Sequence, residues 1–163
     1  MNAAYAIMAF VTLQRLSELV IAKRNTARLM AAGAREVGGE HYPVMVAMHS
    51  AWLAALWFTV GGRPLSLPFL AIFAVLQLLR VWVLATLGPR WTTRIIVTPD
   101  APLVKRGPFR FVRHPNYMVV TAEIAVLPLT FGLVGIALLF TVLNAAMLTV
   151  RIRAENRALY RAA

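Results

Sequence analysis

Two pairs of polar residues flank one long apolar segment and could together hold a ligand. His114 and Tyr117 lie three positions apart in the string RHPNY, directly before this segment, and Arg151 and Glu155 lie four positions apart directly after it. Pro115 suits the first turn of a helix, where its missing N–H costs little. His114 then lies at a helix N-terminus, whose free backbone N–H groups can bind polar or anionic ligand atoms.

The apolar segment itself predicts that the two pairs meet. As one helix, residues 117–150 would be about 50 Å long, which is too long for a single membrane crossing. Pro128 and Gly132 lie near the middle, where a turn would fall. We therefore predict a hairpin of two short helices. An arginine for a carboxylate and a glutamate for an amine or a hydroxyl would suit a zwitterionic nucleoside; a solvated pair on a surface helix is the alternative.

The composition indicates that these elements lie in a membrane. The 163 residues are 60% hydrophobic and 14% charged, with mean hydropathy +0.70, whereas soluble domains have roughly 45–50% apolar and about 25% charged residues. Apolar segments at about Ala3–Ala22, Pro43–Val60 and Leu65–Leu87 each approach the roughly 20 residues of a spanning helix. With the hairpin they predict a single all-α integral membrane domain over residues 1–163, with five transmembrane helices. A re-entrant final pair is the alternative.

The distribution of charge predicts the orientation. The net charge is +11, from 17 Lys and Arg against 6 Asp and Glu. Most basic residues lie in segments 23–42 and 88–116 and in the tail from Arg151, whereas Arg63 lies on the opposite side. The positive-inside rule then places the N-terminus outside and the C-terminus in the cytoplasm of a bacterial-type inner membrane. Anionic membrane lipids, and not nucleic acid, are the partner that this charge predicts.

Ionisable residues inside the apolar spans are costly and mark candidate sites. Arg15 and Glu18, at i and i+3, can pair within the first span, and Arg80 lies in the third. Glu123 has no basic residue one turn away, so it needs Arg15 or Arg80 on another helix, or a cationic ligand. His49 lacks metal-ligand spacing to the other histidines and cysteine is absent, so no metal site is predicted. Residues typical of polar contacts between helices are Gln14, Gln77 and Asn144.

The string RGPFRFVRHPNY, followed by an apolar hairpin and then RIRAE, resembles the isoprenylcysteine carboxyl methyltransferase family of integral membrane enzymes. The resemblance implies S-adenosylmethionine as the cofactor, held in a cytoplasmic pocket by the last two helices and the adjacent loops. LQRLSELVIAKRN, GGEHYP and RWTTRIIV resemble a small bacterial branch of the family associated with type III polyketide synthases. Members of that branch are expected to methylate alkylpyrones or related phenolic lipids on oxygen.

Carried over to this chain, the resemblance assigns His114 and Tyr117 to cofactor binding and places Arg151 and Glu155 beside the cofactor. Arg110, Arg113 and Pro115 would shape the loop that leads to them. The chain departs from the family pattern at two points. Many members have two adjacent glutamates where this chain has Glu155 followed by Asn156, and many have a longer tail than the one that ends here at Ala163.

The expected acceptor is a lipophilic acid that reaches the site from the bilayer. Arg15 or Arg80 would attract its anionic oxygen, and Glu123 would orient it or pair with the arginine. Alternative acceptors are a prenylated-cysteine carboxylate and a phospholipid amine. A non-enzymatic alternative is a small membrane transport or assembly protein, although a transporter is expected to show internal repeats and midplane helix breaks, which this sequence lacks.

Overall fold

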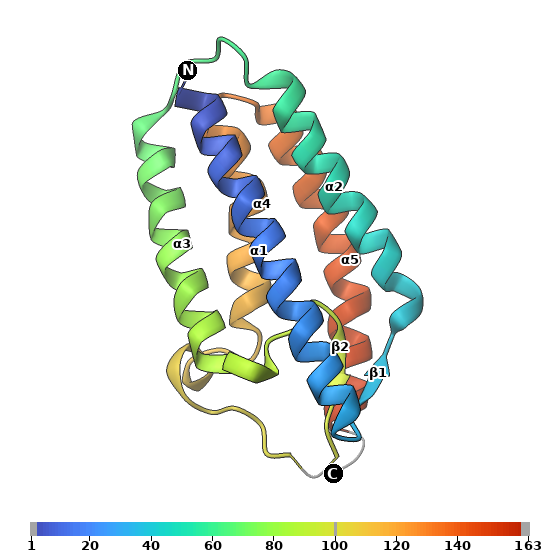
Figure 1. The fold of residues 1–163 in the computed structure, drawn as a ribbon. Helices are drawn as coiled ribbons and strands as arrows, with labels where there is room; N and C mark the ends of the chain where they lie inside the picture. The colour runs from blue at the N-terminus through green and yellow to red at the C-terminus, as the bar shows by residue number, and fades with distance from the viewer. Residues whose placement is uncertain (1–2, 100, 161–163) are drawn as a thin grey trace.

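The protein forms one bundle of long helices. The computed structural model describes residues 3–99 and 101–160, with side chains as far as residue 158. The long helices of this part of the chain are α1 (Ala3–Ala31), α2 (Tyr42–Thr59), α3 (Leu67–Leu87), α4 (Pro115–Thr130) and α5 (Val134–Tyr160). They run side by side, and the two longest loops lie together at the end of the bundle where α1 ends and α2 begins (Figure 1).

Helix length separates the candidate spans into two groups. Three helices, Ala3–Ala31, Leu67–Arg90 and Val134–Ala158, are long and apolar enough to cross a membrane. The 18 residues of α2 and the 16 of α4 correspond to about 27 and about 24 Å, slightly less than the roughly 30 Å of the hydrocarbon core. The predicted number of five spans therefore stays a prediction for α2 and α4.

Helix α1 continues nine residues beyond the predicted end of the first span at Ala22. The segment from Lys23 to Ala31 contains no glycine or proline and is rich in residues of high helix propensity. Hydropathy marks where the hydrocarbon ends and not where the helix ends. The extension has a structural role, because the buried side chain of Asn25 donates hydrogen bonds to the carbonyls of Gly88 and Trp91, at 3.2 and 2.8 Å.

The predicted hairpin is confirmed, with its turn between Thr130 and Val134. Gly132 has a φ of 69°, a left-handed conformation that glycine adopts without steric cost. The N–H of Leu133 donates to the carbonyl of Pro128 at 3.0 Å, which closes the end of α4. The second helix is longer than its apolar part alone: α5 has 27 residues because the polar tail, free of glycine and proline, continues it.

The loop between α3 and α4 contains the strand β2 (Ile95–Val97), which does not form a hairpin within its own loop. It pairs antiparallel with β1 (Arg35–Val37), in the other long loop, with Arg35 opposite Val97. Arg94 reinforces the pairing by donating to both carboxylate oxygens of Glu36, at 2.7 and 2.8 Å. The prolines restrict the remaining loop to the short 3-10 helices η2 (Gly88–Arg90) and η3 (Gly107–Arg110), and η1 (Gly39–His41) precedes α2.

The apolar core occupies the half of the bundle away from these loops. It combines the first turns of α1, the last turns of α2, the start of α3 and the region around the hairpin turn. Its members include Met8, Val11, Leu56, Phe73, Leu127 and Phe131. Tight packing at this end leaves the loop-side half of the bundle as the place where polar side chains and a cavity are found.

Cysteine labelling tests the predicted orientation, because the chain has no cysteine of its own. Arg63→Cys lies in the exposed loop between α2 and α3, and Lys105→Cys lies in the exposed loop before η3. In intact bacterial cells a membrane-impermeant maleimide should label Arg63→Cys, and it should label Lys105→Cys only after permeabilisation. The reverse pattern would contradict the orientation.

Candidate functional site

A cavity of about 430 Å³ lies in the loop-side half of the bundle, within the roughly 300–1,000 Å³ that is typical of small-molecule sites. Side chains from all five long helices line it, together with β2 and the segment that leads into it. Polar groups lie at two places along its wall. One is at the start of α4 beside the loops, and the other is deeper in the bundle between α1, α3 and α4.

Four side chains at the first place are called here the loop-end cluster: His114, Tyr117, Arg151 and Glu155. The Tyr117 hydroxyl donates to Glu155 Oε2 at 2.6 Å, and His114 Nδ1 lies 3.6 Å from the same oxygen. The rings of His114 and Tyr117 stack with their centroids 5.4 Å apart, and the Arg151 guanidinium lies 6.0 Å from the Tyr117 ring centroid. The hairpin thus brings together the two pairs that the sequence placed 34 residues or more apart.

Several buried polar atoms around the loop-end cluster have no hydrogen-bond partner. They are His114 Nε2, Asn116 Oδ1, Trp91 Nε1 and Arg151 Nε, and all four residues line the cavity. A buried donor or acceptor that stays unpaired costs free energy of about 1–3 kcal/mol. Both donors and acceptors are present, next to a carboxylate. This set fits a polar ligand that carries hydroxyl, amine and carboxylate groups, such as the zwitterionic nucleoside predicted from the sequence.

The other residues predicted for cofactor binding have different positions. Arg113 lines the cavity. Pro115 is the first residue of α4 and is buried, so it positions the helix start as predicted. Arg110 is exposed and lies over the Phe111 ring at 4.9 Å, outside the cavity wall.

Sequence reasoning missed Trp91 and Asn116. Asn116 lies inside the RHPNY string itself, in which the other four residues were predicted to form or shape the site. Trp91 lies in a loop, and no local pattern indicates that its side chain is buried or that its carbonyl accepts a hydrogen bond from Asn25. The backbone of Thr93 was also missed; its carbonyl accepts a 3.0 Å hydrogen bond from Arg151 Nη2 and so fixes the arginine.

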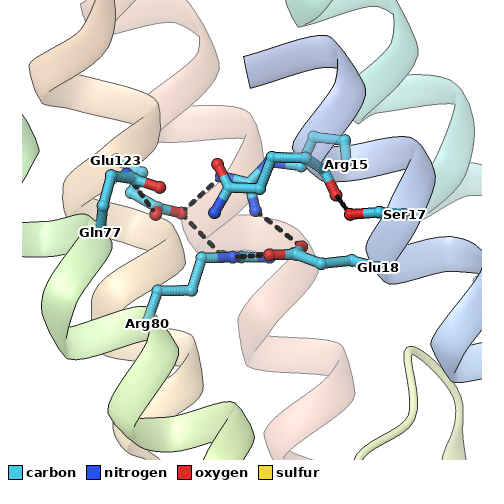
Figure 2. Close-up of polar contacts among 7 residues, drawn as sticks. Arg15, Ser17, Glu18, Gln77, Arg80 and Glu123 are labelled. Atoms are coloured by element: carbon cyan, nitrogen blue, oxygen red, sulfur yellow. Dashed lines mark hydrogen bonds and ion pairs between the residues drawn. The ribbon is translucent and has the colours of Figure 1, made fainter. Parts of the chain in front are cut away.

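The deeper polar group is called here the ion quartet: Arg15 and Glu18 from α1, Arg80 from α3 and Glu123 from α4 (Figure 2). Glu123 Oε2 accepts hydrogen bonds from Arg15 Nη2 and Arg80 Nη1, both at 2.8 Å. Arg80 also donates through Nε and Nη2 to the two carboxylate oxygens of Glu18. The predicted pair within α1 is present, with Arg15 Nη1 3.2 Å from Glu18 Oε2. Gln77 donates to the second oxygen of Glu123 at 2.9 Å.

The ion quartet balances two positive and two negative charges where water is scarce. The Glu123 side chain is 1% exposed and that of Arg80 is 6% exposed. Glu123 therefore has both partners that the sequence offered as alternatives. All four members line the cavity. Arg15 is the member best placed to contact a ligand, because its side chain has the largest exposed fraction, 21%. Their roles toward an acceptor stay predictions.

Comparison with known proteins identifies the family. The sequence profile of the isoprenylcysteine carboxyl methyltransferase (ICMT) family matches residues 69–161, a range that contains the whole loop-end cluster. The chain belongs to this family. It is therefore an integral membrane protein of a methyltransferase family, in agreement with its three long apolar helices.

Two bacterial relatives share almost the full length of this ICMT family member. The uncharacterized protein YpbQ of Bacillus subtilis strain 168 is 38% identical over 160 residues, which cover 95% of each chain. An uncharacterized protein of Haemophilus influenzae is 28% identical over 153 residues, covering 89% of this chain and 88% of its own. No solved structure matches this chain.

Removing the Glu123 carboxylate tests whether the ion quartet holds the bundle together. In Glu123→Ala two guanidinium groups share one carboxylate, so we expect the free energy of unfolding to fall by about 3–5 kcal/mol. The midpoint of thermal unfolding in detergent should fall accordingly. Arg63→Ala, at an exposed loop position, is the control and should stay within about 0.5 kcal/mol of the wild type.

A double variant makes this test specific for charge balance. Arg15→Leu combined with Glu123→Leu removes one charge of each sign, so the remaining Arg80 and Glu18 still compensate each other. We expect the double variant to unfold at a higher temperature than Glu123→Ala alone. Identical midpoints for Glu123→Ala and the wild type would contradict a structural role of the quartet.

Proposed function

We propose that the protein is an S-adenosylmethionine-dependent O-methyltransferase that acts on a lipophilic acceptor in the membrane. The observation that carries this proposal is the loop-end cluster, which lies inside the matched family region and is surrounded by buried polar atoms without partners. A bound cofactor would supply an electrophilic methyl group at the cytoplasmic end of the cavity.

Each residue of the cluster can bind a different group of the cofactor. Glu155, already fixed by Tyr117, can accept hydrogen bonds from an amine or from ribose hydroxyls. Arg151, fixed by the Thr93 carbonyl, can pair with the carboxylate. The partnerless atoms of Trp91 and Asn116 add one donor and one acceptor for the remaining polar groups. Arg113 and His114 complete this part of the wall.

The acceptor has a separate route to the same cavity. Leu16 and Leu19 of α1 and Val46 of α2 line the cavity and are exposed. Exposed apolar residues on the cavity wall fit an alkyl chain that stays in lipid while its polar head enters between α1 and α2. The head would meet the ion quartet, where Arg15 or Arg80 attracts an anionic oxygen and Glu123 orients the arginines.

Positioning is the main catalytic demand under this proposal. Holding two reactants aligned and within reach can lower a barrier by about 7–11 kcal/mol at best. A cavity with a polar nucleoside site at one end and a charged site at the other provides such alignment. An acceptor oxygen that is already ionised near neutral pH needs no strong base. An alkylpyrone or a related polyketide lipid meets this requirement.

A prenylated-cysteine carboxylate is the second candidate acceptor, and the family match favours it because that activity gives the family its name. It shares with the alkylpyrone an acidic oxygen on a long apolar chain. Both candidates use the same topology, in which five helices cross the membrane with the N-terminus outside and the loops, the cluster and the C-terminus in the cytoplasm.

Calorimetric titration tests cofactor binding directly. Detergent-purified protein should bind S-adenosylmethionine and its product S-adenosylhomocysteine. His114→Ala and Glu155→Ala should each weaken this affinity about tenfold or more, because each removes a hydrogen-bonding group worth roughly 1.5–3 kcal/mol to a charged partner. Arg153→Ala, on the exposed face of the same helix, is the matched control and should bind as the wild type does. Absence of binding to folded wild-type protein would refute the proposal.

An acceptor panel tests the substrate class. The protein is incubated with methyl-labelled cofactor and an alkylpyrone, an alkylresorcinol, a farnesylated cysteine or phospholipid vesicles. We expect label in the alkylpyrone, with the farnesylated cysteine as the second candidate. Labelling of phospholipid alone would contradict both acceptor assignments while leaving the methyltransferase reaction intact.

A further inference from the structure

His49 is a histidine on the cavity wall to which neither the cofactor site nor the ion quartet assigns a role. It lies in α2, seven residues after Tyr42, or about 10 Å along the helix axis from the loop end. Glu123 lies eight residues after Pro115 in α4, or about 12 Å from the same end. Both line the one cavity, so the imidazole lies at the depth where the acceptor head would meet the quartet.

The hydrogen bond of His49 fixes which ring nitrogen carries the proton. Nδ1 lies 2.8 Å from the carbonyl oxygen of Met45, one turn back in the same helix. A carbonyl oxygen can only accept, so Nδ1 must carry the hydrogen. In the neutral ring, which predominates above pH 7 for an ordinary histidine, Nε2 then has a lone pair and no proton. The backbone thus prepares the ring as a hydrogen-bond acceptor and base.

Resting on the proposed function, we propose that His49 Nε2 accepts the proton of a hydroxyl acceptor that is still protonated near neutral pH, so that the site takes a weakly acidic phenolic lipid as well as an already ionised acceptor. A lone pair at this place accepts a hydrogen bond from an O–H group. An acceptor that is already ionised gains nothing from a base. The simpler alternative, a histidine that only caps the Met45 carbonyl, does not require the ring to line a cavity.

The proposed step is balanced in atoms and charge. The hydroxyl proton passes to His49 Nε2, and an electron pair of the acceptor oxygen forms the new bond to the methyl carbon. The electron pair of the broken carbon–sulfur bond stays on the sulfur of the departing thioether. The positive charge of the sulfonium ends on the imidazolium, which loses its proton to water at the loop end of the cavity.

The charged groups around His49 suit this transfer. Arg15 of α1, Arg80 of α3 and Arg151 of α5 all act electrostatically on the ring and oppose a positive charge on it. The imidazole is therefore neutral before the transfer and passes its new proton on readily to water. The same arginines attract an acceptor oxygen that becomes anionic as its proton leaves. Glu18 and Glu123, which line the same cavity, compensate two of these arginines. Further titratable groups on the wall include Tyr117 of α4, which is bound to Glu155, and Tyr42 of α2, which is hydrogen-bonded to Thr93.

Nitrogen NMR of histidine-labelled protein tests the tautomer without any turnover. The chain has 3 histidines, and His49→Gln identifies the His49 signals by their loss. We expect a protonated Nδ1 and an unprotonated Nε2, whose resonance shifts when an alkylresorcinol is added in the presence of S-adenosylhomocysteine. A protonated Nε2 on a neutral ring, or an Nε2 resonance that does not respond to the acceptor, would overturn the proposal.

Acceptors of different acidity separate a base from a structural histidine. With a weakly acidic alkylresorcinol, His49→Gln should lower kcat about 100-fold or more, because glutamine can accept a hydrogen bond but cannot take a proton. Raising the pH toward the phenol pKa should restore much of this loss. With a farnesylated cysteine, whose carboxylate is already ionised, kcat should change less than about threefold.

The outcomes distinguish this proposal from the proposed function. If wild-type protein does not bind S-adenosylhomocysteine, the proposed function fails first. If His49→Gln binds it normally, the fold and cofactor site are intact, and an equal loss of kcat with all acceptors overturns the role of His49 as a base. Methylation of farnesylated cysteine by a wild-type protein that does not turn over the alkylresorcinol would also overturn it.

Discussion

Charges inside an apolar bundle must compensate each other, and this requirement shapes the protein. Two arginines and two glutamates from three helices meet in the ion quartet, with Glu123 Oε2 shared by Arg15 and Arg80 at 2.8 Å. Because removing either sign would leave a buried charge unpaired, the quartet fixes how α1 lies against α3 and α4. It also keeps polar side chains in the half of the bundle where the apolar core is absent, and this half contains the cavity.

The hairpin turn at Gly132 has an equally direct consequence at the other end of the cavity. By reversing the chain it places the start of α4 beside the last turns of α5, so Tyr117 can donate to Glu155 at 2.6 Å. The segment that leads into β2 also lines this end of the cavity, and the Thr93 carbonyl there accepts a hydrogen bond from Arg151. One cavity thus has the loop-end cluster at one end and the ion quartet deeper in the bundle, and the proposed methyl transfer uses the first for the cofactor and the second for the acceptor.

The sequence predicted the parts of this arrangement that depend on local chemistry. Pro115 predicted the start of α4, Pro128 and Gly132 predicted the turn, and hydropathy located the apolar cores of the helices. Long-range partners were not predictable in the same way. Nothing local indicates that β2 pairs with β1 and not with its own neighbours, that Asn25 donates to the Trp91 carbonyl, or that Glu123 binds both arginines. The extension of α1 to Ala31 was missed because hydropathy reports the membrane boundary and not helix propensity.

The central claim is that the loop-end cluster binds the nucleoside cofactor and that the cavity connects it to the ion quartet. The most direct measurement is an experimental structure of the protein in lipid nanodiscs with S-adenosylhomocysteine bound. The account predicts ligand density against His114, Asn116 and Glu155, with its sulfur directed along the cavity toward Glu123. Density at another surface of the bundle, with the cluster unchanged and without ligand, would contradict it.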